Sequence, residues 1–198
     1  TYGADPLEGP HFDGADPLPA ILMSHQPLDH VIIMLGTNDM KARFDRSADD
    51  ITAGVMQLVD IVQTSGAGRG SWNTSVVPTV HVFCPPVLGY RAADKGWVKH
   101  KEWLGGWEKS RMLAGVLGRA CHARGIDFID ANEFAVSSPD DPIHWQAATH
   151  RAFGKAMAAQ MAGALATSIP LALIPGGQAV GASRLATTGR LMGQGAVE

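Results

Sequence analysis

The apolar residues of this chain fall into short unbroken runs separated by longer amphipathic stretches. Residues 31–35 are five apolar residues in succession, VIIML, which is typical of a parallel strand covered on both faces. The β-branched and aromatic residues of residues 79–83, and a shorter run at residues 126–129, predict two further strands. We therefore expect a sheet whose first strand, at residues 31–35, is buried.

The amphipathic stretches between these runs have the spacing of helices. Ser47 stands where a capping residue belongs, and Gly125 stands where glycine often follows a helix. Helices are predicted at residues 19–25, 47–65, 107–124 and 145–166, and a long loop with one helical turn at residues 87–106. Strands that alternate with substantial helices predict parallel βαβ units and the α/β fold class.

The composition changes near residue 167. Residues 1–166 contain all the predicted strands and helices and are expected to form one domain. Residues 167–198 contain glycines spread among small residues and few large apolar ones. Such a segment cannot offset the entropy lost on ordering, so we expect a flexible tail.

Charge and composition exclude several classes of function. The 198 residues carry a net charge of -3, with 18% charged and 45% hydrophobic residues, which argues against nucleic-acid binding and against intrinsic disorder. No apolar run approaches the roughly 18 residues of a membrane span, so no membrane partner is expected. Cys84 and Cys121 form no disulfide framework and are expected to be reduced and buried. No signal peptide is visible, which weakly favours the cytoplasm and leaves the compartment undetermined.

Two polar clusters follow predicted strands and are the candidates for chemistry. Asp141 lies three residues before His144, a spacing that lets the carboxylate hold one imidazole nitrogen and leaves the other to act as a general base. Asn38 follows the buried strand and could donate its amide to a developing oxyanion. Each pattern alone is also common in turns and helix caps. Lys41 and Arg43 are expected on a solvated face, and the histidines lack zinc-ligand spacing, so no metal or cofactor is expected.

A resemblance to a known family gives these clusters a more specific meaning. The run LDHVIIMLGTNDMKARF at residues 28–44 closely resembles the third sequence block of the SGNH (GDSL-type) hydrolases, especially their arylesterase and acyltransferase branch. The segment DPIH at residues 141–144 resembles the fifth block. The segment VFCPP at residues 82–86 is similar to the strand and loop that border the acyl pocket. The resemblance extends over about residues 1–165.

The resemblance implies a three-layer flavodoxin-like hydrolase that acts on small acyl esters by a serine mechanism. It implies that His144 is the base, that Asp141 orients it, and that Asn38 donates to the oxyanion hole. Gly36 would allow the backbone to approach the substrate closely. Residues expected to contact the substrate are Thr37, Pro85, Pro86 and Trp145.

One block of the family is absent from the 198 residues. The nucleophile of the family lies in a Gly-Asp-Ser block on the first strand, and no serine here follows a predicted buried strand. We therefore expect an N-terminally truncated hydrolase that is inactive by itself. The alternative is a non-catalytic α/β protein that binds a small acyl compound or a partner chain. A small-molecule ester is the expected partner, and a homo-oligomer is left open.

Overall fold

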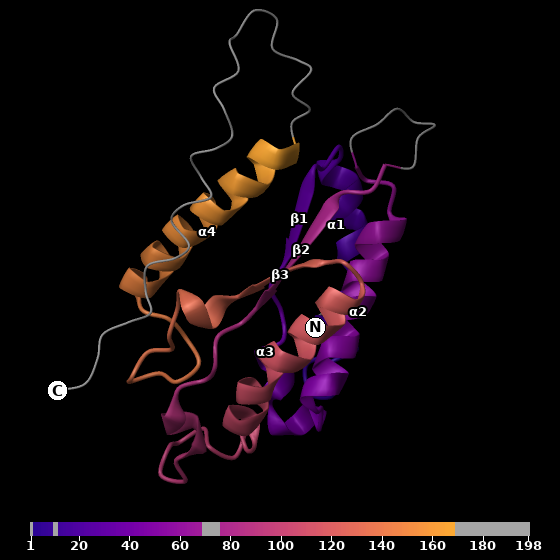
Figure 1. Cartoon of the computed structure of the whole chain (residues 1–198). Helices are drawn as coiled ribbons and strands as arrows, with labels where there is room; N and C mark the ends of the chain where they lie inside the picture. Colours follow the sequence, from indigo (N-terminus) through magenta and orange to yellow (C-terminus); the bar gives the residue numbers. More distant parts are fainter. Residues whose placement is uncertain (1, 10–11, 69–75, 169–198) are drawn as a thin grey trace, which may run out of the picture. The chain divides into compact units, whose positions relative to one another are not determined.

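The first part of the chain is built on a sheet of parallel strands. The computed structural model describes residues 2–9, 12–68 and 76–168, and its strands are β1 (His30–Ile33), β2 (Thr79–Cys84) and β3 (Asp127–Asp130). They are hydrogen-bonded in the order β1-β2-β3 and lie side by side (Figure 1). Because every pairing is parallel, the carboxyl ends of the strands lie at one edge, as the sequence predicts.

The chain divides into two compact units, residues 1–158 and 159–198. Helices α1 (Leu18–His25), α2 (Ala48–Thr64) and α3 (Gly106–Ala123) belong to the first unit, and α4 (Ala147–Ser168) begins in the first and ends in the second. The domain boundary after residue 166 stays a prediction. Residues 167 and 168 of the predicted flexible tail are the last two residues of α4, and its residues 169–198 lie outside the described residues.

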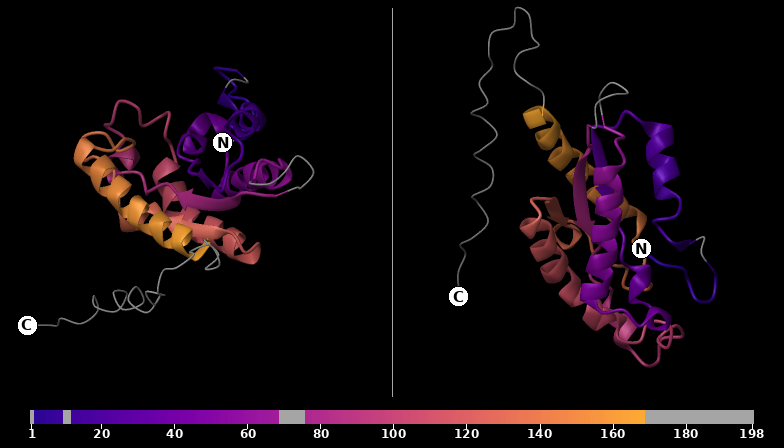
Figure 2. Two further views of the ribbon diagram at one scale, coloured as in Figure 1. Left: turned by 90° about the horizontal axis from the view of Figure 1, so that it is seen from above. Right: turned by 90° about the vertical axis from the view of Figure 1, so that its right-hand side faces the viewer.

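The hydrophobic core lies where α2 and α3 meet the strands. These two helices contact each other and the sheet (Figures 1 and 2). The core includes fully buried side chains from both helices and from β2. Among them are Ile51, Leu58, Val62, Val82, Leu113 and Leu117. The predicted α/β class is therefore confirmed.

The helix boundaries follow the capping signals in the sequence. The Ser47 hydroxyl accepts a hydrogen bond from the backbone N–H of Asp50 at 3.1 Å. The Asp50 carboxylate in turn accepts one from the Ser47 N–H at 2.9 Å, which completes a capping box. Gly125, just beyond α3, has a φ of +64°, a conformation that costs glycine little. Both predicted helix ends are confirmed.

The predicted burial of the first strand is wrong. Only Ile33 is buried, with 5% of its surface exposed, whereas Ile32 is 49% and Leu35 42% exposed. The reason is that β1 is an edge strand of the sheet in the described residues. Helix α2 contacts β1, and Ile33 belongs to the hydrophobic core. Ile32, its neighbour in the strand, points to the opposite face of the sheet.

Three polar side chains are joined across the strands on the face opposite Ile33. His30 Nδ1 lies 2.9 Å from His81 Nε2, and His81 Nδ1 lies 2.6 Å from an Asp127 carboxylate oxygen. His81 is only 2% exposed. Both of its ring nitrogens therefore have partners, as a buried imidazole requires.

The predicted long loop contains the 3₁₀ helix Tyr90–Ala93. Its two tryptophans, Trp97 and Trp103, are buried in the core. Cys84 and Cys121 are free and buried, as expected. Among the described residues, no helix is long and apolar enough to cross a membrane.

Candidate functional site

A sharp turn after β1 presents the first polar cluster. Gly36 has a φ of +129°, a conformation that side chains rarely allow. A Cβ at this position would lie 3.1 Å from Ile51 Cγ2. The turn is followed by Thr37 and by the short 3₁₀ helix Asn38–Met40, in which Asn38 is exposed to solvent.

The segment that follows Asn38 is held by ion pairs. Asp39 is buried and pairs with Arg46. Arg43 Nη2 donates to an oxygen of the buried Asp5 at 2.6 Å. The predicted solvated face at Lys41 and Arg43 is therefore wrong, because these side chains are only 17% and 20% exposed.

The second polar cluster is a tight loop between β3 and α4. Asp141 Oδ2 lies 2.7 Å from His144 Nδ1. Asp141 Oδ1 accepts hydrogen bonds from the backbone N–H groups of Ile143 at 3.0 Å and His144 at 3.3 Å. The His144 carbonyl accepts from the Ser138 N–H at 2.9 Å. The loop thus aims the Asp141 carboxylate at the imidazole, as the spacing predicts.

This geometry determines the charge of Asp141 and the tautomer of His144. The hydrogen bond from His144 lowers the pKa of Asp141, with help from the two backbone N–H groups and against a smaller opposing effect of burial. An ionised carboxylate only accepts hydrogen bonds, so Nδ1 of His144 carries a proton. In the neutral ring, Nε2 is then free to accept a proton. The His144 side chain is 72% exposed, so this nitrogen is accessible.

The two clusters meet in one cavity of about 290 Å³. It brings together the candidate base, the candidate oxyanion donor and the predicted substrate contacts. Its lining residues are Met34, Thr37, Asn38, Pro85, Pro86, Ile143, His144, Trp145 and His150. Gly36 is absent from this cavity and lines a neighbouring one, and Asp141 reaches the site through His144.

Three residues of this cavity are not indicated by the sequence patterns: Met34, Ile143 and His150. The His150 ring lies beside that of Trp145, with the centroids 5.1 Å apart. Its position in the first turn of the helix that follows the DPIH segment is the signal that could have identified it. Among the described residues, no group of three or more His, Cys, Asp or Glu side chains could hold a metal ion.

The described residues show no nucleophile at the end of a strand. The strands of the described sheet are followed by Met34, Pro85 and Ala131, so none of them leads into a serine. Cys84 ends β2, but burial raises the pKa of its thiol to about 12. Such a thiol carries almost no thiolate near neutral pH.

Comparison with known proteins identifies the family. No protein-family model matches the chain, and no curated protein matches it closely. Several solved structures do match the chain. The inhibitor-bound aryl esterase of M. smegmatis is 36% identical with a TM-score of 0.72, and the match covers 82% of this chain and 73% of the esterase. The chain belongs to the SGNH (GDSL-type) hydrolases, in their arylesterase branch.

A second structural neighbour supports the same assignment. A carbohydrate acetylesterase from Sinorhizobium meliloti is 34% identical with a TM-score of 0.73, again over 82% of this chain and 73% of the other. This SGNH hydrolase chain is therefore a member of a family of ester hydrolases, and its α/β fold is the fold of that family.

Proposed function

We propose that the protein hydrolyses small carboxylic esters through an acyl-enzyme and can also pass the acyl group to an alcohol. The main support is the cavity lined by both Asn38 and His144, in which His144 is hydrogen-bonded to Asp141 at 2.7 Å. The apolar lining from Pro85, Pro86 and Trp145 suits a short acyl group. The names of the structural neighbours, an aryl esterase and a carbohydrate acetylesterase, agree with this class of reaction.

The proposed reaction uses a serine hydroxyl as the nucleophile. Its oxygen bonds to the ester carbonyl carbon while its proton passes to His144 Nε2, and the Asn38 amide donates to the resulting oxyanion. When the intermediate collapses, the bond to the alcohol oxygen breaks and this oxygen takes the proton from His144. Water or a second alcohol then attacks the acyl-enzyme in the same way.

The nucleophile is the part of this mechanism that the described residues do not supply. We infer that it comes from a Gly-Asp-Ser block on a strand beside β1, and that the 198 residues by themselves are inactive. His144 and Asp141 alone would give only the small rate that survives loss of the nucleophile.

The experiment compares the 198-residue chain with a fusion in which a Gly-Asp-Ser strand and helix of the family precede Thr1. We expect a burst of p-nitrophenol from p-nitrophenyl acetate only with the fusion. His144→Ala in the fusion should lower kcat by at least about 10³-fold, whereas His122→Ala, an exposed helical histidine, should leave it unchanged. A folded fusion without activity would refute the proposed function. A burst from the unfused chain that disappears with His144→Ala would refute the inference that the 198 residues do not contain the nucleophile.

A further inference from the structure

The segment 95–104, KGWVKHKEWL, exposes large apolar side chains to solvent. It lies between the 3₁₀ helix Tyr90–Ala93 and the start of α3, at the lower end of the view in Figure 1. Val98 is 91% exposed and Leu104 60%, and both line a surface hollow of about 700 Å³. Large apolar side chains that gather at a surface often mark a site of interaction.

The segment is held in shape by its tryptophans and by its backbone hydrogen bonds. Trp97 and Trp103 are buried in the core, so the residue that follows each of them is fixed at the surface. The Trp97 N–H donates to the Asp94 carbonyl at 3.0 Å, and the Trp103 N–H donates to the His100 carbonyl at 3.1 Å. A surface that is already ordered loses little conformational entropy when it binds a partner.

Three lysines lie among the exposed apolar side chains: Lys95, Lys99 and Lys101. All three are exposed, and none of their ammonium groups makes an ion pair or a hydrogen bond within the described residues. Lys95 and Lys101 line the hollow, whose described lining contains no carboxylate. Asp94, which precedes the segment, directs one oxygen at the backbone N–H of Gly96, 2.8 Å away. The lysine charges are therefore open to an external anion.

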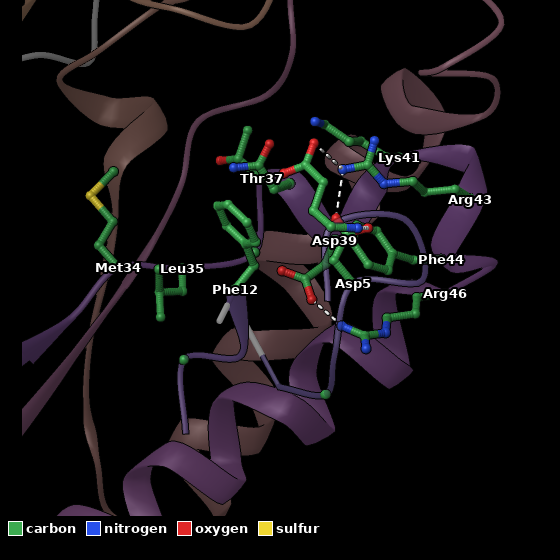
Figure 3. A pocket seen from close by; sticks show the side chains of 15 residues that line it. Asp5, Phe12, Met34, Leu35, Thr37, Asp39, Lys41, Arg43, Phe44 and Arg46 are labelled. Atoms are coloured by element: carbon green, nitrogen blue, oxygen red, sulfur yellow. Dashed lines mark hydrogen bonds and ion pairs between the residues drawn. The ribbon is translucent and has the colours of Figure 1, made fainter. Parts of the chain in front are cut away.

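Glu102, the acid within the segment, is paired with two cations of another cavity. This cavity, of about 440 Å³, adjoins the candidate site. Three residues line both cavities: Met34, Thr37 and Asn38. Lys41 Nζ and Arg43 Nη1, from the cavity in Figure 3, lie 2.9 and 3.5 Å from Glu102 Oε1. Because Glu102 is neutralised there, the segment presents a local positive charge on a chain whose net charge is -3.

We propose that the segment 95–104 docks on a lipid surface that contains anionic phospholipids. Val98 and Leu104 enter the boundary between head groups and acyl chains, and the three lysines meet the phosphate groups. The sequence predicts no membrane partner because no apolar run is long enough to span a bilayer, but a surface contact needs no such run.

The observations favour a lipid surface over other occupants of this segment. A second copy of the segment would bring like charges together. The tryptophans that could stack on nucleic-acid bases are buried. An acidic protein would match the lysines alone, whereas a lipid surface uses both the lysines and the exposed apolar side chains.

The start of the same connection is joined to the loop that contains His144. The Gly89 N–H donates to the Pro142 carbonyl at 2.8 Å, and Arg91 Nη1 donates to the Asp140 carbonyl at 2.8 Å. Docking would therefore hold the candidate site close to esters at the lipid surface. The docking itself does not depend on the proposed hydrolysis.

Vesicle flotation measures the docking directly. The 198-residue chain is mixed with vesicles of phosphatidylglycerol and phosphatidylcholine in equal parts, or with vesicles of phosphatidylcholine alone. Protein that has associated with itself sediments and is counted separately from protein that floats. We expect flotation with the mixed vesicles, little with the neutral ones, and release at about 1 M salt, where the screening length is roughly 3 Å.

Variants test each part of the docking surface. Lys95→Gln, Lys99→Gln and Lys101→Gln should each lower the partition coefficient about fivefold, and Val98→Ser should lower it about tenfold. The matched controls are Lys155→Gln, at an exposed position of α4, and Val136→Ser, at a position 70% exposed. Both controls should bind as the parent does. His144→Ala should also bind as the parent does, so that docking and hydrolysis can fail independently.

Four outcomes would overturn the proposal. The first is that no protein floats with the mixed vesicles, and the second is that neutral vesicles bind the chain equally well. The third is that the lysine variants and Val98→Ser bind as the parent does. The fourth is that poly-L-glutamate, the probe for an acidic protein partner, binds the chain more tightly than the mixed vesicles do.

Discussion

The Asp141 carboxylate is the group whose ionisation most directly reports the geometry of the loop between β3 and α4. Its pKa lies below the ordinary value of 3.8, chiefly because His144 donates a hydrogen bond to it. We expect His144→Ala to raise this pKa back toward 3.8, and ¹³C NMR titration of the carboxyl carbon measures it directly.

The same shift fixes the pH range in which Asp141 stabilises the fold. Because the folded-state pKa is depressed, this contribution is present above the ordinary Asp pKa and is lost as the pH falls through the lowered pKa. The stability difference between the parent and His144→Ala should therefore shrink in acid. A carboxyl that titrates at the same pH in both proteins would contradict the observed hydrogen bond.

Gly36 is a second residue whose identity follows from its conformation. An alanine here would have to adopt a φ near +129° with its Cβ 3.1 Å from Ile51 and 3.4 Å from Leu113. We expect Gly36→Ala to lower the free energy of unfolding by roughly 1–3 kcal/mol, measured by urea denaturation. Gly115→Ala, in the middle of α3 where the nearest atom is Arg119 Nη1 at 3.5 Å, should instead be neutral or stabilising. If both variants change the free energy of unfolding equally, backbone strain at Gly36 is not the cause of the loss.

The candidate catalytic residues could be predicted because each stands in a short local motif. Asp141 lies three residues before His144, and Asn38 lies three residues after an apolar run, so neither placement needs knowledge of distant contacts. The ion pair of Arg43 with Asp5 joins residues 38 positions apart, and no local pattern indicates it. For that reason the sequence places Arg43 on a solvated face, whereas the structure places it in a cavity.

At the level of elements, the start of α2 is stabilised by its capping box. Ser47→Ala removes the acceptor for the Asp50 N–H and should lower the free energy of unfolding by about 1 kcal/mol. Thermal unfolding followed by circular dichroism measures this loss. Ser24→Ala, in α1, removes an exposed hydroxyl bonded only to Ile21 and His25 and should cost less. If the two variants unfold alike, the capping box contributes little.

The elements also show where sequence patterns lose information. Runs of apolar residues identify the strands, but they do not give a strand's position in the sheet, and the exposed Ile32 follows from that position. His30 and His81 are 51 residues apart in sequence, and His81 and Asp127 are 46 residues apart. Only the register of the strands brings these side chains together.

For the molecule as a whole, the edge that β1 leaves unpaired among the described residues is expected to promote self-association. The strand His30–Ile33 contains neither proline nor lysine, the residues that discourage pairing at edges, and Ile32 adds exposed apolar surface. We expect concentration-dependent light scattering from the 198-residue chain, and Ile32→Lys should reduce it.

Val98→Lys is the matched control for this prediction. Val98 is 91% exposed but lies in a loop, so its replacement removes apolar surface without changing the strand edge. A chain that remains a monomer at all concentrations, or an equal effect of both variants, would show that β1 does not drive association.

The shared wall of the two cavities has a practical consequence for inhibitor chemistry. Met34, Thr37 and Asn38 line both spaces, so compounds that occupy each space separately end close to one another. Two weak fragments joined by a short tether would bind as one molecule, the second at an effective concentration of about millimolar. The gain in avidity can reach about 10²–10⁴-fold when the tether matches the span. A tether that crosses Asn38 and carries a hydrogen-bond acceptor would also reach the side-chain amide that we propose as the oxyanion donor.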